Sequence, residues 1–131
     1  MIVPLLQTGG RDARAEVSGK YPSRLVVGED FVMPVAVDNT SGAVIRPLCI
    51  AAQADPGGSV EPISATFQGL DTVPFRAGRA CAGELSGQEV VSVRVTLRPQ
   101  RAGLVRLSLV AAQGGVTIGP ELRGTVEVVA A

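Results

Sequence analysis

The sequence predicts an all-β fold in which two antiparallel sheets pack face to face as a single β-sandwich. Hydrophobic and polar residues alternate in several segments, and turn-forming residues separate these segments at intervals of about 8–12 residues. No long segment has the period of a helix. At 131 residues, the chain is large enough for one hydrophobic core. We therefore expect about seven to nine short strands in one domain.

An extended N-terminal arm is expected over residues 1–15, followed by the sandwich domain over residues 16–131. Residues 1–6 are apolar or proline, but this run is too short to span a bilayer, and no basic segment precedes it as in a secretory signal. We expect no signal peptide and no transmembrane segment in the chain. The compartment stays open, with a virus particle or an extracellular setting favoured over the cytosol.

The first half of the domain is expected to begin with one or two short strands in "RAEVSGKYPSRLVV", broken at Pro22. A longer strand follows in "FVMPVAVD". Its core-facing residues are expected to be Phe31, Met33, Val35 and Val37. Pro34 lies inside this strand and has no N–H to donate, which indicates an edge strand or a bulge. The turn "DNTSG" leads to a strand over Val44–Ala52, which ends at the loop "ADPGGS".

The second half is expected to hold two short strands, in "ISATFQGL" and "TVPF", and then a loop of small residues, "RAGRACAGELSGQ". Three clear strands follow, in "EVVSVRVTLRP", "GLVRLSLVAAQGG" and "ELRGTVEVVA". Their short connections predict that the three are antiparallel neighbours. Their core-facing residues are expected to be Val91, Val93, Val95, Leu97, Val105, Leu107, Leu109, Leu122, Val126 and Val128.

The composition argues against an enzyme and against nucleic acid as a partner. The chain has no histidine, so the usual general base and the commonest transition-metal ligand are both missing. Twelve basic and twelve acidic residues leave no net charge to attract nucleic acid or an anionic membrane. The loop acids Asp55, Glu61 and Asp71 match no calcium-binding spacing. We expect no catalytic residues, no cofactor and no metal site.

The two cysteines, Cys49 and Cys81, leave two possibilities open. They form a disulfide that joins a strand to the long middle loop, or both stay reduced as small, partly buried apolar residues. A catalytic cysteine is not expected, because the chain has no histidine to activate it.

The triplet Asn39-Thr40-Ser41 matches the acceptor for N-glycosylation. It lies in an expected exposed turn, where a sugar could be attached. The preferred interpretation is a turn whose polar side chains bond to the local backbone.

Four residues are candidates for a partner surface, namely Pro34, Arg94, Arg98 and Arg106. Arg94 and Arg98 are expected on the outer face of one strand and Arg106 on that of the next. Together they could form a basic stripe for an anionic partner. The preferred alternative is a solvated sheet face on which acids such as Glu127 pair with the arginines. Pro34 marks a position where a neighbouring strand could pair or be kept from pairing.

Two segments, "VVGEDFVMPVAVDNTSG" and "GQEVVSVRVTLRPQRAGLVRLSLVA", resemble the second strand and the fifth and sixth strands of immunoglobulin-like sandwich modules. The similar groups are bacterial cell-adhesion-related domains, fibronectin type III-like domains and appendage domains of trafficking complexes. The resemblance covers about Glu16–Ala131 and implies a spacer or a protein- or sugar-binding module. Unlike antibody domains, the chain has no tryptophan, Cys81 lies in a loop-like stretch, and the only tyrosine is Tyr21.

These observations favour a non-enzymatic structural or protein-interaction module within a larger assembly, with protein partners or neighbouring subunits and no membrane insertion. An accessory or decoration protein of a virus particle or similar shell is one form of such a module. One alternative is an extracellular module that binds carbohydrate or another ligand, although only four aromatic residues are present. Another is an appendage domain of a cytosolic trafficking complex, for which a reduced Cys49–Cys81 pair would be expected.

Overall fold

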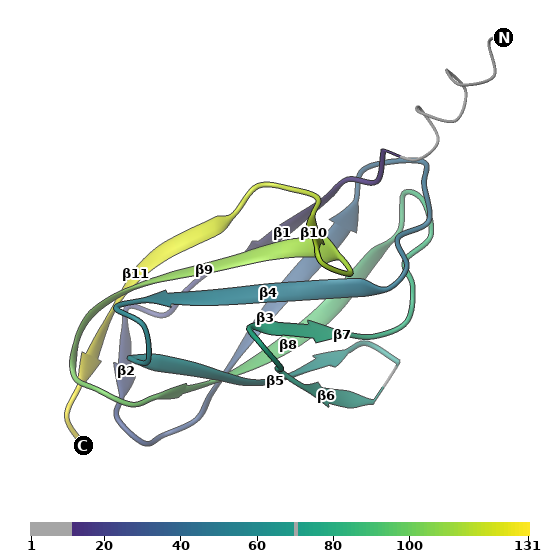
Figure 1. Cartoon of the computed structure of the whole chain (residues 1–131). Helices are drawn as coiled ribbons and strands as arrows, with labels where there is room; N and C mark the ends of the chain where they lie inside the picture. The colour runs from purple at the N-terminus through teal and green to yellow at the C-terminus, as the bar shows by residue number, and fades with distance from the viewer. Residues whose placement is uncertain (1–11, 70) are drawn as a thin grey trace, which may run out of the picture.

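Two β-sheets packed face to face form the protein in the computed structural model, which describes residues 12–69 and 71–131 (Figure 1). The prediction of an all-β sandwich is confirmed. Eleven strands are described, more than expected, because four of them have only two or three residues. Most of the expected N-terminal arm, residues 1–11, lies outside the described residues. Within the described part of the chain, no helix is long and apolar enough to cross a membrane.

The first sheet has five strands in the order β1-β3-β8-β5-β6. Neighbouring strands in it are all antiparallel. Its strands are β1 (Ala15–Gly19), β3 (Phe31–Asn39), β8 (Val90–Pro99), β5 (Val60–Phe67) and β6 (Thr72–Pro74).

The second sheet has six strands, in the order β2-β11-β9-β4-β7 with β10 paired to β9. The β2–β11 pair is parallel, and the other pairs are antiparallel. Its strands are β2 (Arg24–Val26), β4 (Leu48–Asp55), β7 (Arg79–Cys81), β9 (Gly103–Gln113), β10 (Val116–Thr117) and β11 (Leu122–Val129).

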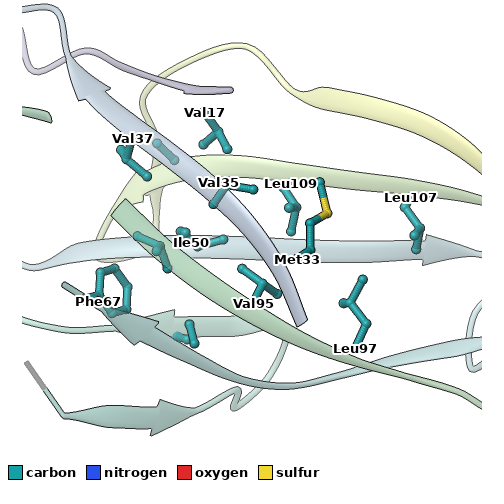
Figure 2. Close-up of a cluster of buried hydrophobic side chains, with 14 of the residues drawn as sticks. Val17, Met33, Val35, Val37, Ile50, Phe67, Val95, Leu97, Leu107 and Leu109 are labelled. Atoms are coloured by element: carbon teal, nitrogen blue, oxygen red, sulfur yellow. The ribbon is translucent and has the colours of Figure 1, made fainter. Parts of the chain in front are cut away.

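Aliphatic side chains fill the space between the sheets (Figure 2). Every expected core-facing residue is buried or half-buried, including Met33 and Val37 on β3, which are 0% exposed. Burying one such side chain contributes about 1.5–3 kcal/mol. The burial that stabilises this core therefore comes mainly from many valines and leucines and not from aromatic residues. Phe67 is the one fully buried aromatic ring in the described residues.

The short connections predicted that the three C-terminal strands are antiparallel neighbours. This prediction is wrong for β8. β9 and β11 do pair in the second sheet, but β8 lies in the first sheet. The backbone N–H groups of Gln100 and Arg101 both donate to the carbonyl of Ser59, in the turn that carries the chain across. Stacked sheets lie about 10 Å apart, so a short connection can join two paired strands or pass between sheets. Alternation is the same in both cases and cannot distinguish them.

Two boundaries also differ from the prediction. β4 begins at Leu48 instead of Val44, because Pro47 interrupts the ladder and Ile45 forms a separate antiparallel bridge with Leu85. The expected loop of small residues contains the edge strand β7, which pairs with β4. Its three residues are too short to show an alternating pattern in the sequence.

Pro34 does not make β3 an edge strand, since β3 lies between β1 and β8. The pairing of β1 ends, however, with Gly19 opposite Val35. Pro34 is the next residue along β3, and it lies opposite Arg94 of β8. In the described residues, this part of β3 therefore has a strand on one side only, where a proline is tolerated.

Candidate interaction surfaces

The outer face of the five-stranded sheet carries mostly short, uncharged side chains. We call its central part the β3–β8 face, which consists of Val32, Pro34, Ala36, Ser64, Thr66, Ser92, Arg94 and Thr96. Arg94 lies at its centre, directly opposite Pro34 on one side and Thr66 on the other. Arg94 is exposed and, within the described residues, makes no side-chain hydrogen bond or ion pair. Val32 is 50% exposed, which leaves apolar surface beside that charge.

Apart from Arg94, the charged residues named on this sheet lie at its margins. Arg98 donates from Nε to Asp30 Oδ1 at 2.7 Å and from Nη2 to Oδ2 at 3.0 Å. These bonds from Arg98 hold the pKa of the Asp30 carboxyl below its usual value. The site candidate Arg98 is thus already occupied by an internal partner, whereas Arg94 is not. At the other end of the sheet, Glu16 lies opposite Asp38.

The expected basic stripe does not form, because its members lie on opposite faces of the molecule. Arg94 and Arg98 belong to β8 in the first sheet, and Arg106 belongs to β9 in the second. The cause is the crossing between the sheets that follows β8. The acid expected to pair with these arginines, Glu127, instead lies 3.6 Å from Arg24.

The outer face of the second sheet is grooved. A hollow of about 670 Å³ lies over β4, β9 and β11, and a hollow of about 360 Å³ adjoins it towards β7. We call the two together the sheet groove. Both hollows are lined by Gln53, Ser108 and Glu121.

Glu121 is held in a fixed position at the groove. Its Oε1 accepts a hydrogen bond from Ser108 Oγ at 2.6 Å, and its Oε2 accepts one from Arg123 Nη2 at 3.1 Å. The bond from Ser108, followed by that from Arg123, holds the pKa of the Glu121 carboxyl below its usual value. The sequence pattern gave no sign of this cluster, because only the strand register places Ser108 opposite Arg123.

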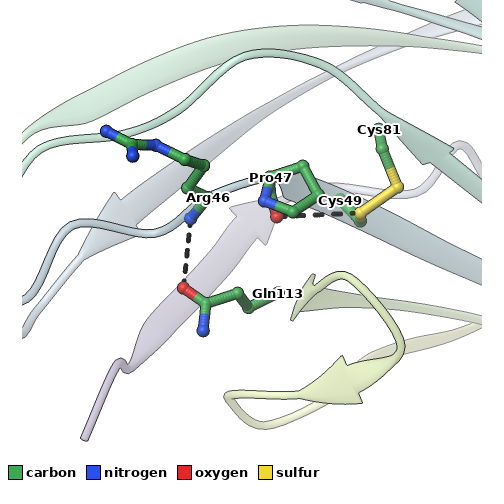
Figure 3. Close-up of a disulfide and its surroundings, with 5 residues drawn as sticks. All are labelled: Arg46, Pro47, Cys49, Cys81 and Gln113. Carbon is green, nitrogen blue, oxygen red and sulfur yellow. Dashed lines mark hydrogen bonds between the residues drawn. A yellow bond between two sulfur atoms is a disulfide. The ribbon is translucent and has the colours of Figure 1, made fainter. Parts of the chain in front are cut away.

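A disulfide joins Cys49 and Cys81 on the outer side of the same sheet (Figure 3). The two residues lie directly opposite each other on β4 and β7, with their Cα atoms 4.0 Å apart. Cys81 therefore belongs to a strand and not to a loop as predicted. Beside the bond, the backbone N–H of Arg46 donates to Gln113 Oε1 at 3.0 Å (Figure 3).

Asn39 is an internal side chain and not an exposed glycan acceptor. It is 0% exposed. Its Nδ2 donates to the carbonyls of Ala43, Leu85 and Ser86, and its Oδ1 accepts from Ser41. The amide that a glycan would modify is therefore buried and in use, so the turn interpretation holds.

In the part of the chain that the structure describes, no exposed aromatic platform exists for stacking a sugar ring. Phe67 is buried, and the other three aromatic residues, Tyr21, Phe31 and Phe75, pack against the core. Tyr21 also donates from its hydroxyl to the carbonyl of Leu122 at 2.6 Å. The described residues likewise contain no cluster of three or more His, Cys, Asp or Glu side chains that could hold a metal ion.

No protein-family model matches the chain, and no curated protein matches it. Solved structures do match its shape. AvmM, which catalyses macrocyclization in alchivemycin A biosynthesis, has a TM-score of 0.60 and 9% identity over 89% of this chain and 88% of that one. The CARDB domain of the PF1109 protein from Pyrococcus furiosus, solved in complex with di-metal ions, has a TM-score of 0.57 and 15% identity over 90% of this chain and 88% of that one. A part of the E. coli alpha-2-macroglobulin also matches, with a TM-score of 0.54 and 17% identity over 92% of this chain and 7% of that one.

These matches show that the fold is an immunoglobulin-like β-sandwich. At such low identities the likeness extends to the fold alone. One of these three proteins is a catalyst, so the fold by itself does not separate a binding module from an enzyme. Any assignment of function has to come from the surfaces of this chain.

Proposed function

We propose that this immunoglobulin-like sandwich is a non-enzymatic module that binds a neighbouring protein through its β3–β8 face. The observation that carries the proposal is the arrangement of charge on that face. Short uncharged side chains surround Arg94, which has no ion-pair partner among the described residues, and the ion pair of Arg98 with Asp30 lies at the margin. The centre of a protein interface is likewise enriched in arginine and depleted of lysine, aspartate and glutamate, and its rim is polar.

The proposed setting is an assembly of repeated subunits, such as the shell of a virus particle or a comparable particle. The short strands β6 and β7 end the two sheets, and short edges limit unwanted pairing with other chains. A broad sheet face then remains as a surface for a specific neighbour. The disulfide supports an oxidising compartment over a cytosolic trafficking complex.

Charge reversal at the centre of the face tests the proposal. Arg94→Glu would bury an unmatched negative charge in the interface, and it should weaken binding by about tenfold or more. Arg24→Glu is the matched control, since it makes the same change on the outer face of the other sheet. The measurement is the amount of native partner that co-purifies with each variant from the source cells, together with sedimentation of each purified variant to detect self-association.

Melting temperatures close to that of the unmodified protein would show that both variants are folded. Loss of the partner, or of self-association, in the Arg94 variant alone supports the β3–β8 face. Equal retention by both variants, or equal loss from both, would exclude this face as the site of contact.

A further inference from the structure

The sheet groove lies on the opposite side of the molecule from the β3–β8 face and has a different chemistry. Its shape follows from the register of three strands. Gln53, Ser108 and Arg123 lie directly opposite one another on β4, β9 and β11. In the next row, Asp55 lies opposite Arg106. The short side chain of Ser108 is flanked by longer ones, so a hollow forms above it.

Two arginines of the groove have hydrogen-bonding groups that the described residues do not use. Arg106 is exposed and makes no side-chain hydrogen bond or ion pair with any described residue. Arg79 lines the smaller hollow, and its Nε is buried without an acceptor in the described part of the chain. A buried N–H group without an acceptor is unfavourable. The exposed guanidinium of Arg106 is therefore available to an incoming oxygen, and a guanidinium binds a carboxylate best through two parallel bonds.

The groove also offers groups that suit hydroxyls. Each carboxylate oxygen of Glu121 accepts one bond, from Ser108 or from Arg123, and has a lone pair left. The side chain of Gln53 makes no hydrogen bond within the described residues and can both donate and accept. All four aromatic residues of the chain pack in or against the core, so recognition in the groove depends on charge and hydrogen bonds.

We propose that the sheet groove binds a small carboxylic acid that carries several hydroxyl groups, the chemical class to which acidic sugars belong. The carboxylate binds to the guanidinium of Arg106. Hydroxyl groups donate to Glu121 and exchange hydrogen bonds with Gln53. This site is independent of the proposed protein interface, because it uses the other sheet and none of the same residues.

A titration followed by amide NMR shifts tests this proposal with three probes. D-glucuronate has the carboxylate and the hydroxyls, D-glucose has the hydroxyls alone, and acetate has the carboxylate alone. We expect D-glucuronate to shift the amides of residues 106–108 and 121–125 in a saturable manner. Acetate should bind at least about tenfold more weakly, and D-glucose should cause no shift there. An equal response to D-glucuronate and either other probe, or shifts located elsewhere, would overturn the proposal.

Two variants complete the test. Arg106→Gln removes the proposed carboxylate contact and should weaken D-glucuronate binding by about tenfold or more. Arg24→Gln removes the same charge from the same sheet face outside the groove, and it should bind as the unmodified protein does. Both positions are exposed, so both variants should fold, which their amide spectra will report directly. Equal weakening in the two variants would show a general charge effect and no site.

Discussion

The side chain of Asn39 forms hydrogen bonds to several backbone groups at once. Asn39 ends β3, and its amide holds two separate segments of the chain, the turn at Ala43 and the loop at Leu85 and Ser86. The side chain is fully buried, so water cannot take over these bonds. A polar residue buried in this way stabilises the fold only while all its partners are present.

Asn39→Ala should lower the free energy of unfolding by about 2–4 kcal/mol, because three carbonyls and a backbone N–H lose their partner together. Denaturant unfolding measures the change. Thr40→Ala is the control, since Thr40 is exposed and its hydroxyl makes only one long bond to Arg14. A loss at Asn39 no larger than that at Thr40 would contradict the role given to the buried amide.

At the scale of elements, β7 depends on a covalent link as well as on hydrogen bonds. It has three residues, forms one edge of the second sheet, and carries Cys81 opposite Cys49. The disulfide closes a loop with a sequence separation of 32 residues. It ties the segment between β4 and β7 to the sheet at one point.

The double variant Cys49→Ala, Cys81→Ala should lose about 3–4 kcal/mol of stability, the amount expected from chain entropy for a loop of this length. Amide hydrogen exchange should rise first in β7, because its remaining ties to β4 are few. Unfolding experiments with and without a dithiol reductant on the unmodified protein provide the matched comparison. Unchanged stability, or exchange that rises evenly over both sheets, would contradict this account.

The sequence predicted the strands and their inward faces far better than which strands pair with one another. Alternation gave the inward faces of β3, β8, β9 and β11 correctly, because period two depends only on each strand's own environment. Alternation could not show that β8 and β9 lie in different sheets. The predicted basic stripe was wrong because it assumed that these two strands are neighbours. The sheet groove could not be predicted from the sequence for the same reason. Its residues come together through the register between strands far apart in the sequence.

At the scale of the whole molecule, the chain passes repeatedly from one sheet to the other, and Tyr21 secures one of these crossings. It lies between β1 in the first sheet and β2 in the second. Its ring packs so closely on Gly124 that any larger residue there would overlap it. Burial raises the pKa of the Tyr21 phenol above its usual value.

This pKa shift predicts how stability depends on alkaline pH. The neutral phenol is favoured in the folded state, so its contribution is fully present below the unfolded pKa of about 10 and is lost as the pH rises further. Tyr21→Phe should remove this part of the alkaline loss, and it should cost about 1 kcal/mol at neutral pH for the bond to Leu122. Because Tyr21 is the only tyrosine, phenolate absorbance follows this one group. Ionisation near pH 10 in the folded protein would contradict the prediction.

The direction of the outermost strands determines how the molecule would carry a mechanical load. The first described residues and the C-terminus lie at opposite ends of the sandwich (Figure 1). β1 is fastened along β3 by five register pairs, and β2 runs parallel to β11 with three. Tension between the two ends therefore acts along these strands, so the bonds of each pair are sheared together instead of being peeled apart one by one. A domain with this geometry should therefore resist unfolding when its two ends are pulled apart.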